Sequence, residues 1–383
     1  FKTSWKVNIG GSDYDYTDDM TVLKNGNIVA VGQSYSNDGD FQNLLKGGSI
    51  AYINQYDPKG ELLKTLTLGG TEYDSIAYAA KVCGLDDGGF VVSGGYQEGV
   101  YVAPTGDFAQ LDTAGTVHGQ MDTFIAKYDS NSKLIWMSNF SGSANDQVKQ
   151  IKATDDGGIA VLIETNSNDG DMENQNRGLY DLVIVKYDAH GKKVWQRVLG
   201  GKNIETSSSG LDILSDGSFI VAGSLSSKSG DFADVDWYGD IFDCFAAKIS
   251  ATGELLWTKA YGGDRNDYCN SVLATSDGGF ILMGNTKSTT DTFAPIGTGY
   301  DNAYVLKCNE TGETEWVNVI KSSEASEMIS AIELEDQYVF IGQSRGTDYD
   351  VTGLNKGSMD VFIANYEKNG TLDGTATEYW KII

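Results

Sequence analysis

The stretch SDGGFILMGNT, residues 276–286, joins an Asp-Gly turn to an alternating apolar run. Asp-Gly is a strong hairpin signal because both residues tolerate positive φ, and alternation with period two is typical of a strand. Variants of the stretch begin at five other positions, Lys24, Asp86, Asp155, Ser215 and Glu335. A unit that recurs at intervals of tens of residues indicates a repeat architecture.

Each repeat shows the same order of signals. A GGxxxD loop precedes the first strand, DGGF joins the first strand to the second, a long loop holds GDF, and the third strand ends in KYD before a Gly turn and a fourth strand that opens with Trp. Runs such as FIAKYD from Phe124 alternate with period two, so we predict a four-stranded antiparallel meander. The repeat units are approximately 10–68, 69–140, 141–199, 200–261, 262–320 and 321–383.

Six such sheets must cover both of their faces, and the repeat supplies no helix to cover them. Radial stacking buries both faces and leaves only short edges, so we predict an all-β, six-bladed β-propeller, with residues 1–383 as one domain. A linear solenoid would need polar caps, and none is visible. In the last repeat Trp380 follows Gly370 by ten positions, whereas Trp195 follows Gly191 by four. We therefore predict that residues 4–9 complete the last blade and close the ring.

Composition limits the partners. The chain has 54 acidic and 28 basic residues, a net charge of -26. This charge opposes binding to phosphate backbones and anionic lipid, so we expect no nucleic-acid partner. No apolar run approaches the ~20 residues that span a bilayer, so we expect no membrane insertion. The sequence begins at Phe1 without an initiator Met, and we expect that a leader has been removed or lies upstream.

Cysteine and histidine give little support for catalysis. Cys83, Cys244, Cys269 and Cys308 fall at different places in the repeat without CxxC spacing, so they are interpreted as buried fillers, with a disulfide as the alternative. His118 lies in an irregular loop and His190 in a hairpin turn. By strand order they fall on opposite faces, which argues against zinc and against a Ser-His or Cys-His arrangement.

Acidic residues gather at one end of the predicted blades. In an up-down-up-down sheet, the connection from the second to the third strand and the connection to the next sheet emerge at the same end. Three columns of side chains meet there. The column after GG holds Asp15, Asp74, Asp146, Glu205, Asp267 and Ser326; the GDF column holds Asp40, Asp107, Asp171, Asp231, Thr292 and Asp350; the column before the third strand holds Ile50, Asp122, Asp181, Asp243, Asn302 and Asp360.

Two interpretations of these columns stay open. In the structural one, each Asp accepts backbone N–H bonds and the next residue fills the gap between blades; those residues are Phe41, Phe108, Met172, Phe232 and Phe293. In the functional one, calcium binds oxygen ligands on SNDGDF and SNDGDM, through Asp38 and Asp40 and through Asp169 and Asp171. No organic cofactor is expected.

Departures from the repeat are the better candidates for a binding site. Trp237 lies outside the fourth-strand Trp column, beside Asp236 and Tyr238 in the acidic loop GDFADVDWYGDIFD. An aromatic plate next to carboxylates suits a sugar-binding or protein-binding surface. Tyr101 and Tyr300 are predicted to share that face. The alternative is that these aromatics pack on the neighbouring blade.

The DGGF, SNDGDF, KYD..G...W and GG motifs cover almost the whole chain, and their pattern resembles the repeats of secreted bacterial surface propellers, including lipoprotein-like ones. The hairpin KYDAHGKKVW, from Lys186, also resembles the tryptophan-docking motif of quinoprotein-type propellers. These resemblances imply a fold and an extracellular or cell-surface location. They imply no quinone site, because no residues here match one.

We therefore predict a non-enzymatic binding or scaffold module, with a role such as adhesion, that recognises glycan or protein through its acidic long-loop face, with calcium as a possible stabiliser. The alternatives are a carbohydrate-active hydrolase or lyase that uses two carboxylates of that face, and a structural spacer. We expect a monomer or part of a larger surface protein.

Overall fold

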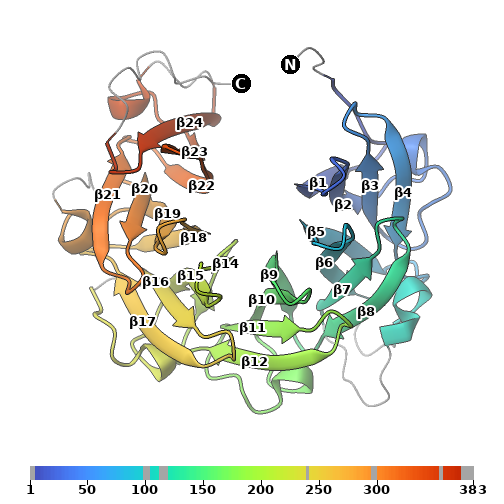
Figure 1. The fold of residues 1–383 in the computed structure, drawn as a ribbon, viewed down its shortest axis with the longest axis horizontal. Helices are drawn as coiled ribbons and strands as arrows, with labels where there is room; N and C mark the ends of the chain where they lie inside the picture. Colours follow the sequence, from blue (N-terminus) through green and yellow to red (C-terminus); the bar gives the residue numbers. More distant parts are fainter. Residues whose placement is uncertain are drawn as a thin grey trace. The chain divides into compact units, whose positions relative to one another are not determined.

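A computed structural model describes residues 5–97, 104–111, 120–238, 241–294, 300–352 and 357–371. The chain is all-β, with six consecutive antiparallel sheets, one in each repeat (Figure 1). This confirms the predicted fold class at that level and matches a six-bladed β-propeller. Two compact units are present, residues 1–176 with 183–198, and residues 177–182 with 199–383. No helix in the described ranges is long and apolar enough to cross a membrane.

The first three sheets are meanders of four strands each, in the order of the chain. The first holds β1 (Asp15–Val22), β2 (Ile28–Ser34), β3 (Ile50–Tyr56) and β4 (Leu62–Leu68). The second holds β5 (Ile76–Gly84), β6 (Phe90–Gln97), β7 (Asp122–Tyr128) and β8 (Leu134–Phe140). The third holds β9 (Asp146–Ala153), β10 (Ile159–Thr165), β11 (Asp181–Tyr187) and β12 (Lys193–Leu199).

The fourth sheet has a broken first strand, because β13 (Glu205–Thr206) and β14 (Leu211–Ile213) both pair with β15. It continues with β15 (Phe219–Leu225), β16 (Asp243–Ile249) and β17 (Leu255–Tyr261). The fifth holds β18 (Asp267–Ala274), β19 (Phe280–Thr286), β20 (Asn302–Cys308) and β21 (Thr314–Ile320). The sixth holds β22 (Ser326–Glu333), β23 (Gln337–Ser344) and β24 (Asp360–Glu367), and has three strands within the described residues.

A short 3-10 helix follows the second strand of every sheet. These helices carry the GDF sequence or its equivalent, and Phe41 of the first is fully buried. Their bounds are η1 (Gly39–Phe41), η2 (Gly106–Leu111), η3 (Gly170–Met172), η4 (Gly230–Phe232), η5 (Asp291–Phe293) and η6 (Tyr349–Val351).

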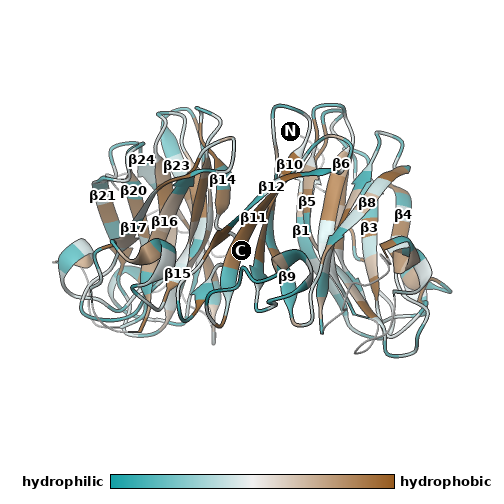
Figure 2. Ribbon diagram, turned by 90° about the horizontal axis from the view of Figure 1, so that it is seen from below, coloured by the Kyte–Doolittle hydropathy of each residue, from teal (hydrophilic) through white to brown (hydrophobic). Residues whose placement is uncertain are grey.

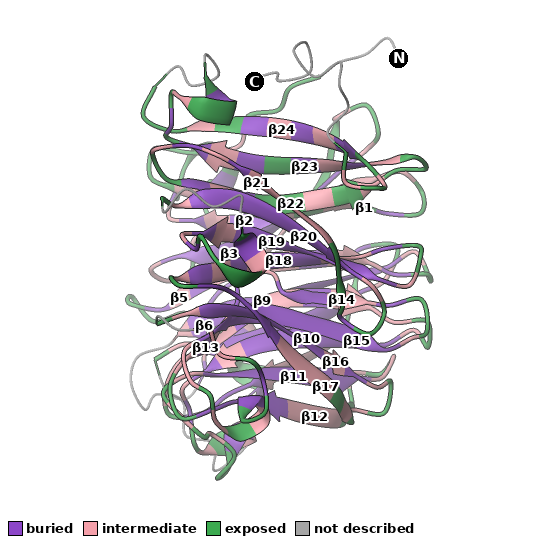
Figure 3. Ribbon diagram, turned by 90° about the vertical axis from the view of Figure 1, so that its left-hand side faces the viewer, coloured by how far each residue is buried: buried purple, intermediate pink, exposed green. Residues whose placement is uncertain are grey.

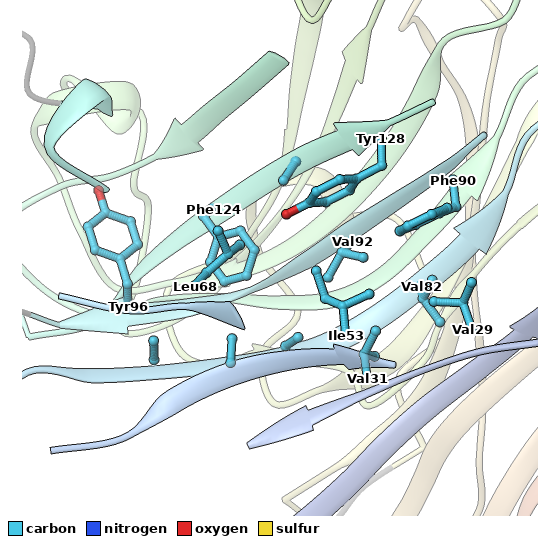
Figure 4. Packing of buried hydrophobic residues seen from close by; sticks show 14 of the residues in the cluster. Val29, Val31, Ile53, Leu68, Val82, Phe90, Val92, Tyr96, Phe124 and Tyr128 are labelled. Atoms are coloured by element: carbon cyan, nitrogen blue, oxygen red, sulfur yellow. The ribbon is translucent and has the colours of Figure 1, made fainter. Parts of the chain in front are cut away.

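The core lies between neighbouring sheets. Every residue of β3 is buried, whereas β4 at the sheet edge is exposed at Leu62 and Leu63. Val31 and Ile53 of the first sheet pack with Val92 and Phe124 of the second (Figure 4). Apolar residues concentrate in the strands and polar residues in the loops (Figure 2), and burial follows the same division (Figure 3). Apolar surface on both faces of the inner strands therefore holds neighbouring sheets together within each unit.

Tryptophans of the fourth strands fix one sheet to the next. The indole N–H of Trp136 donates to the carbonyl of Ala189 at 3.1 Å, in the β11–β12 turn. A Cβ on Gly191, whose φ is 81°, would lie 2.6 Å from the Trp136 ring. Only glycine fits here, because the position combines positive φ with close contact to an aromatic face. Trp316 makes the same contact with the sixth sheet, through the carbonyl of Lys368 at 3.3 Å.

Trp5 makes this contact without belonging to a sheet. Its indole N–H donates to the Pro58 carbonyl at 3.3 Å, and a Cβ on Gly60 would lie 2.4 Å from its ring. Residues 5–9 lie outside the six sheets. Trp5 therefore contacts the β3–β4 turn of the first sheet as Trp136 contacts the β11–β12 turn, although Trp136 belongs to the fourth strand of the preceding sheet and Trp5 belongs to none.

All four cysteines are free thiols; Cys244, Cys269 and Cys308 are buried and Cys83 is half-buried. The interpretation as buried fillers is confirmed for Cys244, Cys269 and Cys308 and holds only in part for Cys83, and the disulfide alternative is wrong in this structure.

Candidate functional site

The GDF column performs one task in every sheet. Its six side chains each accept the backbone N–H of the residue at the GG position, at 2.8 to 3.2 Å. Thr292 does so with its hydroxyl where the other five use a carboxylate. The residue after each of them is almost completely buried, as predicted. The task needs an oxygen acceptor and not a charge, so the structural interpretation of this column is confirmed.

The other two columns form buried carboxyl pairs between neighbouring sheets. A residue that begins a third strand lies near one that begins the next sheet's first strand. We call Asp122 with Asp146, Asp181 with Glu205, and Asp243 with Asp267 the carboxyl pairs; all six residues are at most 3% exposed. A Cβ on Gly262 would lie 2.4 Å from Asp243 Oδ1 and 3.2 Å from Asp267 Oδ2, so glycine alone fits between them.

Hydroxyl groups and backbone N–H groups surround the member of each pair that begins a first strand. Asp267 accepts from the Ser288 hydroxyl at 2.7 Å, from the backbone N–H of Gly263 at 3.0 Å, and from the Thr286 hydroxyl. Asp146 accepts from the Thr165 and Ser167 hydroxyls in the same way. These bonds hold the start of the first strand against the second strand of its own sheet.

Burial determines the protonation of the carboxyl pairs. It raises the pKa of Asp146 to about 8, and that of Asp267 and of Glu205 to about 7. The charge of the partner carboxyl adds to each rise. Burial also raises the pKa of Asp181 and of Asp243 to about 6. Oδ1 of Asp181 and of Asp243 and Oε1 of Glu205 have no hydrogen-bond partner within the described chain, which makes the ionised forms costly.

One residue of the first column was assigned wrongly. The GG spacing places Asp74 in that column, but Asp74 is exposed in the loop before β5. Ala77 pairs with Tyr96 at the position that Asp146 has in the third sheet. Tyr96 is 2% exposed and stacks on Phe108, with ring centroids 4.7 Å apart. A buried aromatic ring therefore takes the space that a carboxyl–hydroxyl contact fills elsewhere.

The four carboxylates suggested for calcium all accept backbone N–H bonds. Asp38 accepts from Ser12 and Asp169 from Ser143, both at 2.7 Å, and Asp40 and Asp171 belong to the GDF column. Asp171 also pairs with Lys193 at 2.7 Å. The described residues contain no group of three or more His, Cys, Asp or Glu side chains arranged to hold a metal ion. Calcium binding stays a prediction.

The loop after η4 contributes to a hollow of about 370 Å³. Asp234, Asp236 and Tyr238 of this loop line it, together with Thr258 to Tyr261 of β17, Thr292, and Gly312 to Thr314 of the β20–β21 turn. We call this space the β17 hollow. The structure thus brings together Asp236 and Tyr238, two of the predicted binding residues, along an edge strand (Figure 1).

The walls of the β17 hollow are polar. Asp234 and Asp236 are exposed, and Lys259 pairs with Glu313 across one end. Tyr238 is half-buried; its backbone N–H donates to Asp243 Oδ2 at 3.0 Å. Burial raises the pKa of the Tyr238 hydroxyl, and Asp236 adds to the rise, so this hydroxyl is a donor at neutral pH.

The remaining predicted aromatics lie elsewhere. Trp237 is half-buried and does not line the β17 hollow, although Asp236 and Tyr238 on either side of it do. Tyr300 is 50% exposed, and its carbonyl accepts from the Asn302 side chain at 2.7 Å. Tyr101 and His118 lie outside the described residues. The sequence contains no sign that residues of β17 line a hollow, because they have the same pattern as the residues of any other solvent-facing strand.

Comparison with known proteins gives limited guidance. No protein-family model matches the chain. The regulatory protein FlaEY of Caulobacter vibrioides is 25% identical over 320 residues, which cover 73% of this chain and 33% of that protein. The chain therefore spans about a third of the length of the curated relative that it matches.

Several solved structures are similar at low identity. A protein of unknown function from Dyadobacter fermentans has 11% identity and a TM-score of 0.45, covering 88% of this chain and 93% of that chain. An ulvan lyase has 9% identity and a TM-score of 0.46, covering 93% and 80%. The parainfluenza virus 5 hemagglutinin-neuraminidase ectodomain has 9% identity and a TM-score of 0.41, covering 96% and 82%. At TM-scores below 0.5 these similarities say nothing about ligands or activity.

Proposed function

We propose that the protein is a non-enzymatic binding module of a bacterial cell surface, which recognises a glycan through the β17 hollow. The observation that carries the proposal is the meeting of Tyr238, Asp236 and Thr258 in one hollow. An aromatic ring supplies an apolar plate for a sugar, while carboxylates and hydroxyls bond to its hydroxyl groups. The volume is within the range of about 300 to 1,000 Å³ typical of small-ligand sites.

The buried state of the carboxyl pairs supports binding over hydrolysis. Glycoside hydrolysis needs two carboxyl groups that flank the scissile bond. The carboxyl pairs of the described chain are at most 3% exposed, so a polysaccharide cannot contact them without local opening. A labelled polysaccharide should therefore bind without turnover. Cleavage that is lost in the Asp236→Asn variant would instead favour the hydrolase or lyase alternative.

The binding proposal is tested with a glycan array followed by calorimetry on the Tyr238→Ala variant. We expect at least tenfold weaker binding of the best neutral glycan, with a melting temperature within a few degrees of the wild type. Tyr73→Ala is the matched control, because Tyr73 is 95% exposed and far along the chain from the β17 hollow. Equal affinities for wild type and Tyr238→Ala would contradict the proposal.

Trp237 lies between Asp236 and Tyr238 in the chain without lining the β17 hollow, and we propose that its half-buried ring extends the glycan-binding surface beyond the hollow. We expect Trp237→Ala to weaken glycan binding while leaving the melting temperature within a few degrees. Loss of the folded state would show instead that Trp237 is a core residue.

We also propose that the six sheets form a closed ring, in which residues 4–9 add the fourth strand of the sixth sheet. The support is the contact of Trp5 with Pro58 and Gly60, which reproduces the contact of Trp316 with the sixth sheet. Engineered cysteines in residues 5–9 and in β24 should then form a disulfide in the intact chain. Failure of every neighbouring pair to cross-link would contradict closure.

Calcium stabilisation is a third, separable part of the proposal. Asp38 and Asp40 each use one carboxylate oxygen for a backbone N–H, whereas both oxygens of Asp171 are engaged. The loop after β2 is therefore the better calcium candidate. Calcium should raise the melting temperature in proportion to the logarithm of its concentration, and the Asp38→Asn variant should lose the effect. No shift up to millimolar calcium, with magnesium as control, would remove calcium from the account.

A further inference from the structure

A second hollow, of about 440 Å³, lies between the fifth and sixth sheets. Its walls come from the starts of β18 and β22, the ends of β19 and β23, and the residues before β20 and β24. The side chains that determine its chemistry are Tyr268, Asn285, Lys287, Asp301, Glu327 and Arg345. We call it the Arg345 hollow. It is less polar than the β17 hollow, and none of the predicted binding residues lines it.

Both acids of the Arg345 hollow already have partners. Asp301 pairs with Lys287 at 3.2 Å and accepts from the Asn285 amide at 3.2 Å. Glu327 accepts from the Asn270 amide at 3.0 Å and from the Gln343 amide. The bond to Lys287 neutralises Asp301, whereas Glu327 keeps its negative charge and has its oxygens occupied by two neutral amide donors.

Arg345 is the basic residue of the hollow that has no acidic partner within the described residues. Its side chain is exposed, and its guanidinium has no hydrogen-bond or ion-pair partner among the described residues. Its backbone N–H donates to the Ala325 carbonyl at 2.9 Å, which holds the residue at the rim. Two basic and two acidic side chains line the hollow, so its net charge is zero, and Arg345 alone among these four makes no side-chain bond within the described residues. A guanidinium in this setting favours a bidentate carboxylate.

The floor of the hollow is neutral. At this junction the two columns that hold the carboxyl pairs elsewhere contain Asn302 and Ser326, and the Ser326 hydroxyl bonds to the Ser344 hydroxyl at 2.7 Å. No buried carboxylate of these columns therefore repels an anion here. In a chain of net charge -26, that absence is what allows an anionic group to bind.

An aromatic wall completes the hollow. Tyr268 is half-buried, and its ring lies 5.2 Å from that of Phe242. Its hydroxyl accepts from the Asn266 amide at 3.4 Å, which fixes the ring. Met359 adds a 40% exposed apolar side chain. The hollow thus offers a guanidinium, amide and hydroxyl groups, and an apolar plate.

From these contacts we propose that the Arg345 hollow binds a carboxylate-bearing sugar, a uronic acid residue of an acidic polysaccharide. Arg345 holds the carboxylate, the ring of Tyr268 stacks on the sugar, and Asn285 with Gln343 bonds to its hydroxyl groups. The site is separate from the β17 hollow, so it stands or falls independently of the neutral-glycan site proposed above.

The test uses calorimetric titration with an α-1,4-linked galacturonate trimer and with the matching galactose trimer. The wild type should bind the acidic trimer at least tenfold more tightly than the neutral one, and added salt should weaken only the acidic trimer. Equal binding of the two trimers would overturn the proposal.

Two variants separate the site from general charge. Arg345→Gln should lose at least tenfold in affinity for the acidic trimer and nothing for the neutral one, while Arg345→Lys should lose less. Lys59→Gln removes the same charge from an exposed turn of the first sheet and should leave the affinity unchanged. An unchanged affinity in Arg345→Gln, or an equal loss in Lys59→Gln, would contradict the role of Arg345. Binding of acetate alone with similar affinity would show that the sugar contacts contribute nothing.

Discussion

The junction between the fourth and fifth sheets and the junction between the fifth and sixth use the same two repeat positions in opposite ways. The former places Asp243 and Asp267 together, fully buried and close to a glycine. The latter places Asn302 and Ser326 there, next to a hollow whose arginine has no ion-pair partner among the described residues. At the junction that keeps the repeat, the two acids join strands; at the junction that departs from it, neutral side chains lie next to the proposed anion site.

This difference corrects a natural reading of the acidic face. A concentration of carboxylates at one end of a sheet suggests a metal or catalytic site, but most of these side chains accept backbone N–H or hydroxyl groups. Repetition indicates a requirement that every sheet shares. Binding is therefore expected at Tyr238 and at Arg345. The residue at the position of Arg345 in the fifth sheet, Lys287, is also basic, but it is paired with Asp301.

The largest expected effect is on stability at the kept junction. Asp267→Ala removes the acceptor of three buried donors, and we expect a loss of about 3 kcal/mol in the free energy of unfolding at pH 5. Ser326→Ala, at the same repeat position, breaks one hydroxyl–hydroxyl bond and should cost about 1 kcal/mol. Urea denaturation measures both. Equal losses would remove the distinction between the junctions.

The second effect concerns pH. The carboxyl pairs have pKa values raised above those of the unfolded chain, so the folded state binds more protons. The stability that the pairs contribute is therefore lost as pH rises from about 4 through about 8. We expect the free energy of unfolding to fall by several kcal/mol between pH 5 and pH 8, because each raised carboxyl contributes about 1.4 kcal/mol per pH unit below its folded pKa. Burial raises the pKa of Asp156 and of Asp216, but hydrogen bonds to hydroxyl and lysine groups outweigh burial and lower both values to about 2. The stability that these two carboxylates contribute is therefore lost as pH falls, and only below about pH 4.

The control for this pH effect is a neutral isostere. Asp146→Asn keeps contacts with the Thr165 and Ser167 hydroxyls and removes the titration, so its stability should vary less between pH 6 and pH 9 than that of the wild type. The double variant Asn302→Asp with Ser326→Asp adds an acid pair at the junction between the fifth and sixth sheets. In this variant the free energy of unfolding should fall more steeply with pH than in the wild type. A wild-type stability that rises over this range would contradict the account of the carboxyl pairs.

A smaller effect is expected at the junction that ring closure would create. In the proposed closed ring, Asp360 of the last repeat and Asp15 of the first repeat hold the two column positions of this junction. Trp5→Ala should cost about 1 to 2 kcal/mol, since the Trp5 ring is 39% exposed and makes one hydrogen bond. Urea denaturation compares it with Trp136→Ala, which should cost more. No loss in Trp5→Ala would argue that the N-terminal segment is peripheral.

Much of the fold was predictable because its signals are local. The Asp-Gly turns, the alternating strands and the Gly of the KYD turn each depend on a few adjacent residues. Asp74 shows the limit, because its spacing from GG matched the column while the pairing of Ala77 with Tyr96 set a different register. Pairing depends on how a ring as large as Tyr96 packs, which spacing alone does not report.

The sites were less predictable than the fold. Asp236 and Tyr238 could be selected because they stand out from the repeat, but their companions on β17 and in the β20–β21 turn come from other parts of the chain. Arg345 gave no signal in the sequence. Its side chain becomes informative only when Asp301 and Glu327, the two acids that line the same hollow, are seen to have other partners.

The most direct test of the central claim is one thermal-shift experiment, with and without the galacturonate trimer, on Asp146→Ala and Arg345→Gln. We expect Asp146→Ala to melt several degrees lower than the wild type but to keep the shift that the trimer produces. Arg345→Gln should melt with the wild type and lose that shift. If the trimer still stabilises Arg345→Gln, or if Asp146→Ala loses the shift while keeping its melting temperature, then the repeated acids and not the departures from the repeat carry the binding.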